Sequence, residues 1–299
     1  MISKPVERKV EMTIERTLGQ RPTIGVFIVA KNEERDLPNA IQSVRWCDQL
    51  VVVDMASTDR TAEIARSYGA EVFPYPDVGY VEPALQFATE KISTDFVLRL
   101  DADEIVNLEL KQFLYREVAQ CEHDVFFLRR KNFIFGCYSG NNRYYKDRQL
   151  RFWRKGSVTH TDLIHTHPIV HSKKIYYAPH GYQACIVHFN QRTIHEYVDK
   201  MNRYTEKEPL EQLRFGNFFY EFFIKYLGKL FYLVLVNRSF LNKNDLTLEY
   251  LTSTYHFVKY LKSIERQQNQ NVVAEYQNLA EQEIRKLNNS DAITDPKEL

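Results

Sequence analysis

The sequence lacks several features that mark well-defined protein classes. Its four cysteines form no C-x-x-C pair and no regular spacing, which favours reduced thiols in a cytosolic protein over a disulfide framework. The net charge of +1 gives no overall positive field that would attract nucleic acid. Residues 1–21 are charged and have no apolar core segment, so we expect neither a signal peptide nor a membrane span there.

Three carboxylates directly follow a strongly apolar segment. Residues 97–106 read V-L-R-L-D-A-D-E-I-V, and the acids are Asp101, Asp103 and Glu104. Carboxylates this close repel one another, and a cation between them removes that cost. Residues i and i+2 of an extended chain point the same way, so Asp101 and Asp103 could face one Mg²⁺ or Mn²⁺ ion that also binds substrate phosphates. A solvated acidic turn is the alternative for this segment alone.

Strand-like and helix-like segments alternate around these acids. Apolar runs predict strands at 24–29, 49–53, 71–75 and 97–100, and helical spacing predicts helices at 37–44, from 61 onward and at 82–92. This alternation predicts a mostly parallel sheet with helices on its faces. Ligands bind at the carboxyl ends of strands in such sheets. Because Asn32, Asp54 and Asp101 follow three of the strands, we expect them to line one crevice.

Three motifs occur in a fixed order: V-A-K-N-E-E at residues 29–34, V-V-D-M-A-S-T-D-R-T at 52–61 and L-D-A-D-E at 100–104. Together they make residues 23–106 resemble the nucleotide-sugar-binding half of family 2 glycosyltransferases, most similar to the branch with bacterial lipopolysaccharide-core and other envelope glucosyltransferases. The resemblance implies the GT-A fold, an α/β fold with a mostly parallel sheet flanked by helices. It also implies an inverting, metal-dependent transfer of a sugar, usually UDP-linked, to an envelope glycan or lipid-linked acceptor.

The resemblance also implies roles for individual residues. Four positions would contact the nucleotide: Ala30, Asn32, Glu33 and Asp54. Asp103 would bind the metal on the diphosphate, and Asp101 would hold the ribose or belong to the metal site. Met55 stands where many members carry a second acid, which leaves the choice of nucleotide open.

Histidines are dense in the middle of the chain: His160, His165, His167, His171, His180 and His188. No H-E-x-x-H motif or cysteine pair accompanies them, so we expect most of them around an acceptor pocket rather than in a zinc site. His188 ends a short apolar strand where the resembling fold often completes its metal site. His188 is therefore either a ligand of Mn²⁺ or Mg²⁺ or a buried structural histidine.

An inverting transfer needs a carboxylate that accepts the proton of the acceptor hydroxyl. The similar branch has a histidine–glutamate pair after a segment that here reads R-F-W-R-K-G at 151–156, but this chain has His165-Thr166 at the pair. Asp162 is the nearest carboxylate, so it is either the base or a surface turn residue of an altered site. The two arginines of the segment, Arg151 and Arg154, would contact the donor diphosphate or an acidic acceptor.

The C-terminal third predicts helices at 195–211, 218–241 and 248–264, followed by a solvated helix. Segment 218–241 is aromatic and aliphatic except for one polar stripe: Glu221, Lys225 and Lys229. These charges argue against a spanning helix. We expect this segment to contact the membrane interface or a second subunit, with packing against the catalytic domain as the alternative.

We therefore predict a charged extension (1–22), a GT-A catalytic domain (23–195) and a helical region (196–299). Within the catalytic domain, 23–106 would bind the nucleotide sugar and 107–195 the acceptor. The expected location is the cytoplasm or the inner face of the cytoplasmic membrane. A non-catalytic nucleotide-sugar-binding assembly or regulatory subunit is the alternative function, because no acid follows His165. A nucleotidyltransferase is disfavoured, since no glycine-rich loop with a lysine follows the first strand.

Overall fold

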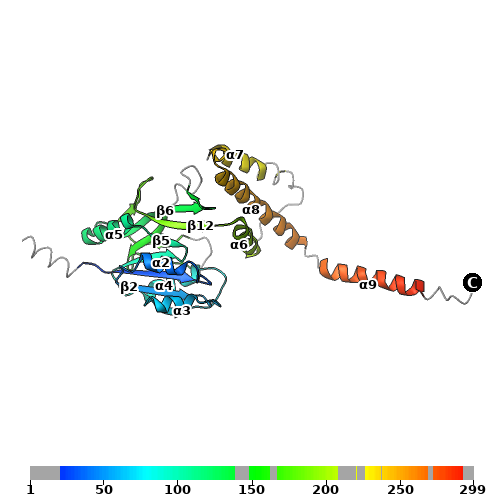
Figure 1. Ribbon diagram of the computed structural model, residues 1–299, viewed down its shortest axis with the longest axis horizontal. Helices are drawn as coiled ribbons and strands as arrows, with labels where there is room; N and C mark the ends of the chain where they lie inside the picture. Colours follow the sequence, from blue (N-terminus) through cyan, green and yellow to red (C-terminus); the bar gives the residue numbers. More distant parts are fainter. Residues whose placement is uncertain are drawn as a thin grey trace, which may run out of the picture. The chain divides into compact units, whose positions relative to one another are not determined.

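The computed structural model describes residues 21–138, 148–161, 167–207, 220, 226–236, 238–268 and 272–291 (Figure 1). The chain forms two compact units, Met1–Ile194 and His195–Leu299. The first contains the sheet, and the second is helical where it is described.

The first half of the sheet is parallel. Its strands lie in the order β3 (Glu71–Pro74), β2 (Gln49–Asp54), β1 (Ile24–Ala30) and β4 (Phe96–Asp101). The apolar run of β1 is buried almost throughout, as expected for a central parallel strand that is covered on both faces. This half agrees with the parallel arrangement predicted from the alternating segments.

Helices cover both faces of the parallel half (Figure 1). The crossover helices are α2 (Leu37–Ser43), α3 (Thr61–Ser67) and α4 (Glu82–Lys91). Alternate residues of β1 enter different cores, because side chains of a strand alternate between faces: Ile28 packs in the cluster with α2, and Phe27 in the cluster with α4. Asp36 stands before α2, but its side chain makes no cap hydrogen bond and pairs with Arg192 instead.

The second half of the sheet is mixed, whereas the first half is parallel. Beyond β4 the order is β8 (Arg148–Arg154), β6 (Val125–Ile134), β12 (Cys185–Gln191) and β5 (Glu104–Val106). β8 is antiparallel to β4 and β6, and β5 is antiparallel to β12, whereas β6 and β12 are parallel. β6 is one continuous strand of ten residues.

Smaller elements complete the first unit. These are α5 (Leu108–Gln120), β7 (Cys137–Tyr138), β9 (Val158–Thr159), β10 (Ile169–Val170) and β11 (Ile175–Tyr177). The side chain of Asn107 caps α5 by accepting a hydrogen bond from the backbone N–H of Leu110 at 2.9 Å. An α/β fold with helices flanking the sheet, followed by a helical C-terminal region, is therefore confirmed.

The second unit contains α6 from His195 onward (Ile194–Lys207), α7 (Lys229–Val236), the 3₁₀ turn η2 (Ser239–Leu241), α8 (Lys243–Gln268) and α9 (Val272–Asp291). Charged groups join α6 to α8, where Lys262 contacts Glu206 at 2.7 Å and Arg266 contacts it at 3.0 Å. The helix predicted to reach Leu241 ends at Val236, and Arg238 has a φ of 50°. Within the described residues, no helix is long and apolar enough to cross a bilayer.

Candidate active site

The carboxyl ends of three parallel strands lie side by side. Ala30 of β1 pairs with Asp54 of β2, and Val29 pairs with Asp101 of β4. The structure therefore brings the predicted polar positions after these strands, including Asn32, to one edge of the sheet. This is the edge at which ligands bind in parallel α/β sheets.

Asn32 ties the loop after β1 to the loop after β2. It has a φ of 55°, a conformation that asparagine tolerates better than most residues. Its backbone N–H donates to Ser57 Oγ at 2.9 Å, and its side-chain oxygen accepts from the Thr58 N–H at 2.8 Å. The N–H of Ser57 in turn donates to the carboxylate of Asp54 at 3.3 Å. These hydrogen bonds hold the two loops together beside the strand ends.

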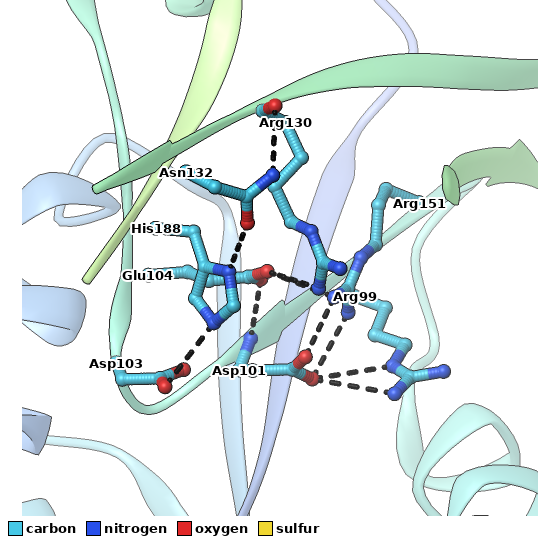
Figure 2. A network of polar contacts seen from close by, with 8 residues as sticks. All are labelled: Arg99, Asp101, Asp103, Glu104, Arg130, Asn132, Arg151 and His188. Atoms are coloured by element: carbon cyan, nitrogen blue, oxygen red, sulfur yellow. Dashed lines mark hydrogen bonds and ion pairs between the residues drawn. The ribbon is translucent and has the colours of Figure 1, made fainter. Parts of the chain in front are cut away.

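Asp101 is held by two arginines that come from β8 and from its own strand. Arg151 donates from both terminal nitrogens, at 2.9 Å and 2.6 Å, and Arg99 contacts the same carboxylate at 3.4 Å (Figure 2). Burial alone would raise the pKa of Asp101, but the charges of Arg151 and Arg99 hold it well below its usual range. Asp101 is therefore an ionised group fixed by a bidentate pair.

Glu104 is fully buried and closes the turn that carries the acids. Its carboxylate accepts from the backbone N–H of Asp101 at 3.0 Å and from Arg151 at 2.8 Å, and Arg130 lies 3.4 Å away. Burial raises the pKa of Glu104 despite the opposing charge of Arg151. In β5 it lies opposite His188 of β12. Glu104 thus fixes both the acidic turn and the guanidinium beside it.

Asp103 and His188 point toward each other at one side of this network (Figure 2). His188 Nε2 lies 3.2 Å from Asp103 Oδ2, and His188 Nδ1 lies 2.6 Å from the side-chain oxygen of Asn132. The side chain of Asp103 is 28% exposed, whereas His188 is buried. A ligand arriving from solvent can therefore reach the carboxylate of Asp103.

The Asp103–His188 pair fits a divalent ion that takes its other ligands from substrate and water. Among the residues that the structure describes, no group of three His, Cys, Asp or Glu side chains is arranged around an ion. Mg²⁺, however, is commonly held by one or two protein side chains together with substrate phosphates. Neighbouring ligands of an octahedral ion with bonds of about 2.1 Å lie about 3.0 Å apart, close to the observed 3.2 Å. Asp101 is directed to its arginines instead.

The predicted diphosphate contacts are placed differently. Arg151 is 3% exposed and binds Asp101 and Glu104, so in the structure it supports the acidic turn. The structure does not bring Arg154 to the site: it pairs with Phe96, at the opposite end of β4 from Asp101, and its Nε donates to Asp124 at 2.8 Å. The proposed base Asp162 and the neighbouring His165 lie outside the described residues.

One further buried histidine lies beside this network. His160 packs edge-on against Trp153, with ring centroids 5.3 Å apart, and its Nε2 has no hydrogen-bond partner among the described residues. Burial, with the charges of Arg99 and Arg151, lowers the pKa of His160 to about 4. The ring is therefore neutral at pH 7, which excludes a role as a charged contact for phosphate.

Sequence reasoning did not single out Arg99, Arg130 or Asn132. Arg99 stands two residues before Asp101, and the period-2 rule for strands would have placed both on one face. The other two lie on β6, and only the register between β6 and β12, in which His188 pairs with Asn132, brings them to the acidic turn.

Comparison with known proteins identifies relatives for the sheet-containing part of the chain. Residues 25–175 match the family model for glycosyl transferase family 2. The chain is 28% identical to an uncharacterized glycosyltransferase of Rickettsia typhi, over 67% of this chain and 71% of that protein. It is also 28% identical to the lipopolysaccharide core biosynthesis glycosyltransferase LpsC of Rhizobium meliloti, over 64% and 73%.

A crystal structure is also similar in part. Glucosyl-3-phosphoglycerate synthase from Mycobacterium tuberculosis, in complex with Mg²⁺ and UDP, is 25% identical with a TM-score of 0.33. The match covers 42% of this chain and 48% of that chain, so this chain spans about half of the synthase.

Proposed function

The chain belongs to glycosyl transferase family 2, and on that premise we propose an inverting enzyme that uses Mn²⁺ or Mg²⁺ and a UDP-hexose donor. Its α/β fold is of the GT-A type, as predicted from the sequence. The observation that carries the proposal is the contact between the partly exposed carboxylate of Asp103 and the buried imidazole of His188 at the carboxyl edge of the parallel strands. Residues 23–195 form the proposed catalytic domain. The similarity to a lipopolysaccharide core enzyme supports an envelope glycan or lipid-linked acceptor.

The charges around the site favour a metal and a diphosphate entering together. Three guanidinium groups, those of Arg99, Arg130 and Arg151, form ion pairs with Asp101 and Glu104. Asp103 is the third carboxyl group, so the numbers of guanidinium and carboxyl groups are equal. A divalent cation alone would upset this balance, whereas a cation with the negative charges of a diphosphate would preserve it. When bound by Asp103 and His188, such an ion would neutralise charge on the departing diphosphate.

The chain's own groups supply binding and proton transfer. Our proposed nucleotide contacts are four positions at the ends of β1 and β2 and in the loop after β1: Ala30, Asn32, Glu33 and Asp54. Asp101, ionised and fixed by Arg151, is the proposed ribose contact. Asp162 is the proposed base: it accepts the hydroxyl proton while the acceptor oxygen bonds to the anomeric carbon and the bond to the diphosphate breaks.

An apolar surface in the second unit supports contact with a membrane. Its most exposed side chains lie on α7 and η2: Phe231, Tyr232, Leu235, Val236, Phe240 and Leu241. The groove between α7 and α8 is lined mainly by apolar side chains such as Leu230 and Leu246. Residues 226–244 contain Lys229, Arg238 and Lys243 but no acidic residue.

We assign this α7–η2 surface to the anionic inner face of the cytoplasmic membrane. Basic residues beside exposed apolar ones are typical of interfacial segments. A second copy of the chain is the less suitable occupant, because two like-charged surfaces would meet. Phe222 and Phe223 of the predicted segment 218–241 lie outside the described residues.

The test of the activity compares wild-type protein with Asp103→Asn in UDP-glucose and Mn²⁺. We expect the variant to release UDP roughly 100-fold more slowly, because a bound ion contributes several kcal/mol of charge stabilisation. Calorimetry should show Mn²⁺-dependent UDP binding only in the wild type. Asp199→Asn, on the exposed face of α6, is the matched control and should behave as wild type.

Two results would count against the proposal. Equal, metal-independent UDP affinity in wild type and Asp103→Asn would remove the metal assignment. UDP binding without release of UDP from any UDP-hexose would favour the non-catalytic binding module.

A further inference from the structure

We propose that Asn132 is a positioning residue that sets the tautomer of His188 and so makes His188 Nε2 available to a metal ion. The inference rests on the metal-dependent function proposed above. It concerns a residue of β6 that lies beyond the D-x-D motif and is separated from His188 by 56 residues.

The side-chain amide of Asn132 has a defined orientation. Its NH₂ group donates to the backbone carbonyl of Arg130 at 3.3 Å, which directs its oxygen toward His188 Nδ1 at 2.6 Å. An amide oxygen only accepts hydrogen bonds, so His188 Nδ1 must carry the proton of this short contact. Both side chains are buried, so this contact is shielded from water.

A neutral imidazole that is protonated on Nδ1 has a lone pair on Nε2. In the structure that lone pair lies 3.2 Å from Asp103 Oδ2, which is also an acceptor. Two acceptors at this separation repel each other unless a metal ion or a second ring proton lies between them. A metal-bound histidine typically donates its other ring N–H to an outer acceptor, which fixes the ring and raises its basicity as a ligand.

The sheet leaves His188 little freedom to choose another partner. Along β12 it is paired with Glu104 of β5 on one side and with Asn132 of β6 on the other. Rotation of the ring would break the 2.6 Å contact and leave a buried polar atom unsatisfied. Asn132 thus holds the imidazole with Nε2 toward Asp103, as Figure 2 shows.

The test uses two variants of the full chain. Asn132→Leu removes the acceptor at similar volume, and Asn132→Asp keeps an acceptor at the same place. In the presence of UDP, we expect Asn132→Leu to bind Mn²⁺ about 10- to 100-fold more weakly by calorimetry, the usual effect of removing such a partner. Asn132→Asp should bind Mn²⁺ at least as tightly as wild type. Equal weakening in both variants, with both folded, would overturn the proposal, because packing would then explain the loss.

A second readout needs neither metal nor turnover. Nitrogen NMR of the histidine rings should show His188 of the metal-free wild type as the Nδ1–H tautomer, and Asn132→Leu should lose this preference. Wild type with Nε2–H would overturn the proposal whatever the metal data show. If wild type shows Nδ1–H and yet binds no Mn²⁺ with UDP, the proposed function fails while the tautomer assignment stands.

Discussion

Arg151 and Glu104 of the first unit are almost completely buried, whereas Phe231 and Leu241 of the second unit are 68% and 66% exposed. Both arrangements depart from the usual partition of residue types. In the first unit, charges that water would solvate are solvated by one another: Arg151 bridges Asp101 and Glu104. In the second unit, side chains that would normally be buried face outward.

The two units differ in what compensates the buried charges of one and the exposed apolar side chains of the other. The buried charges carry their partners within the same sheet, so the first unit holds its polar network before any ligand arrives. The exposed apolar side chains of the α7–η2 surface have no equivalent cover in the described part of the chain. Large exposed apolar patches mark interaction sites. We therefore expect the first unit to bind a small polar ligand and the second to contact an apolar surface.

Removing the central guanidinium should have the largest effect on this comparison. In Arg151→Leu, the fully buried Glu104 and the partly exposed Asp101 lose their common partner, and the free energy of unfolding should fall by about 3–5 kcal/mol. Urea unfolding followed by tryptophan fluorescence measures this change. Arg154→Leu is the matched control, because its pair with Asp124 is more exposed, and it should lose roughly 1 kcal/mol or less. Equal losses in the two variants would mean that the buried network is not special.

Substitutions in the α7–η2 surface should weaken binding to vesicles rather than lower the stability of the fold. We expect the double variant Phe240→Ser, Leu241→Ser to lose about 3 kcal/mol of binding to anionic vesicles, roughly 100-fold in affinity. Its unfolding midpoint should stay near that of wild type, since both side chains are mostly exposed. Vesicle flotation measures the affinity.

The control tests whether substituting any exposed apolar pair would weaken vesicle binding. Tyr276→Ser with Leu279→Ser changes two exposed apolar residues of α9 and should leave binding unchanged. Wild-type protein that stays in solution as a monomer would contradict the membrane assignment. A dimeric mass that the Phe240 and Leu241 substitutions abolish would assign the surface to a second copy instead.

Much of the parallel half could be predicted because its signals are local. Apolar runs, helical spacing and the polar residues after each strand all lie within a few positions of the elements they define. The pairing of Arg151 with Asp101 could not be predicted, because it depends on the antiparallel register between β4 and β8 across 50 residues. From the sequence alone, Arg151 could not be distinguished from an arginine that binds the donor diphosphate.

The helical unit shows the same limit. Composition predicted an unusually apolar segment, and α7 is apolar and exposed. The end of α7 at Val236 was not predicted, and the residue with positive φ after it is Arg238 rather than a glycine. The roles of Asp54, Asp101, Asp103 and His188 remain predictions that the geometry accommodates.

His160 is a buried polar side chain of the first unit whose Nε2 has no hydrogen-bond partner among the described residues. Its pKa is lowered from 6.5 to about 4 in the folded chain, so the unfolded chain binds the proton first as the pH falls. Its contribution to stability is full above about pH 6.5 and is lost toward pH 4. Between pH 7 and pH 5 this amounts to about 2 kcal/mol.

The measurement is urea unfolding of wild type and His160→Phe at pH 7 and pH 5. Wild type should lose about 2 kcal/mol more than the variant over this interval. His195→Phe, whose side chain is 86% exposed, is the control and should keep the wild-type pH dependence. Parallel pH profiles for wild type and His160→Phe would show that the buried network tolerates a charged imidazole.

The smallest predicted effect concerns the charge at the rim of the α7–η2 surface. Arg238 has a φ of 50°, so asparagine, which tolerates this conformation, is the substitution that removes the charge with least strain. Arg238→Asn should weaken binding to anionic vesicles by about 1 kcal/mol, roughly fivefold, and the difference should shrink in high salt. Arg238→Lys should bind as wild type. If Asn and Lys bind equally, or if salt leaves the difference unchanged, the surface is recognised by its apolar side chains alone.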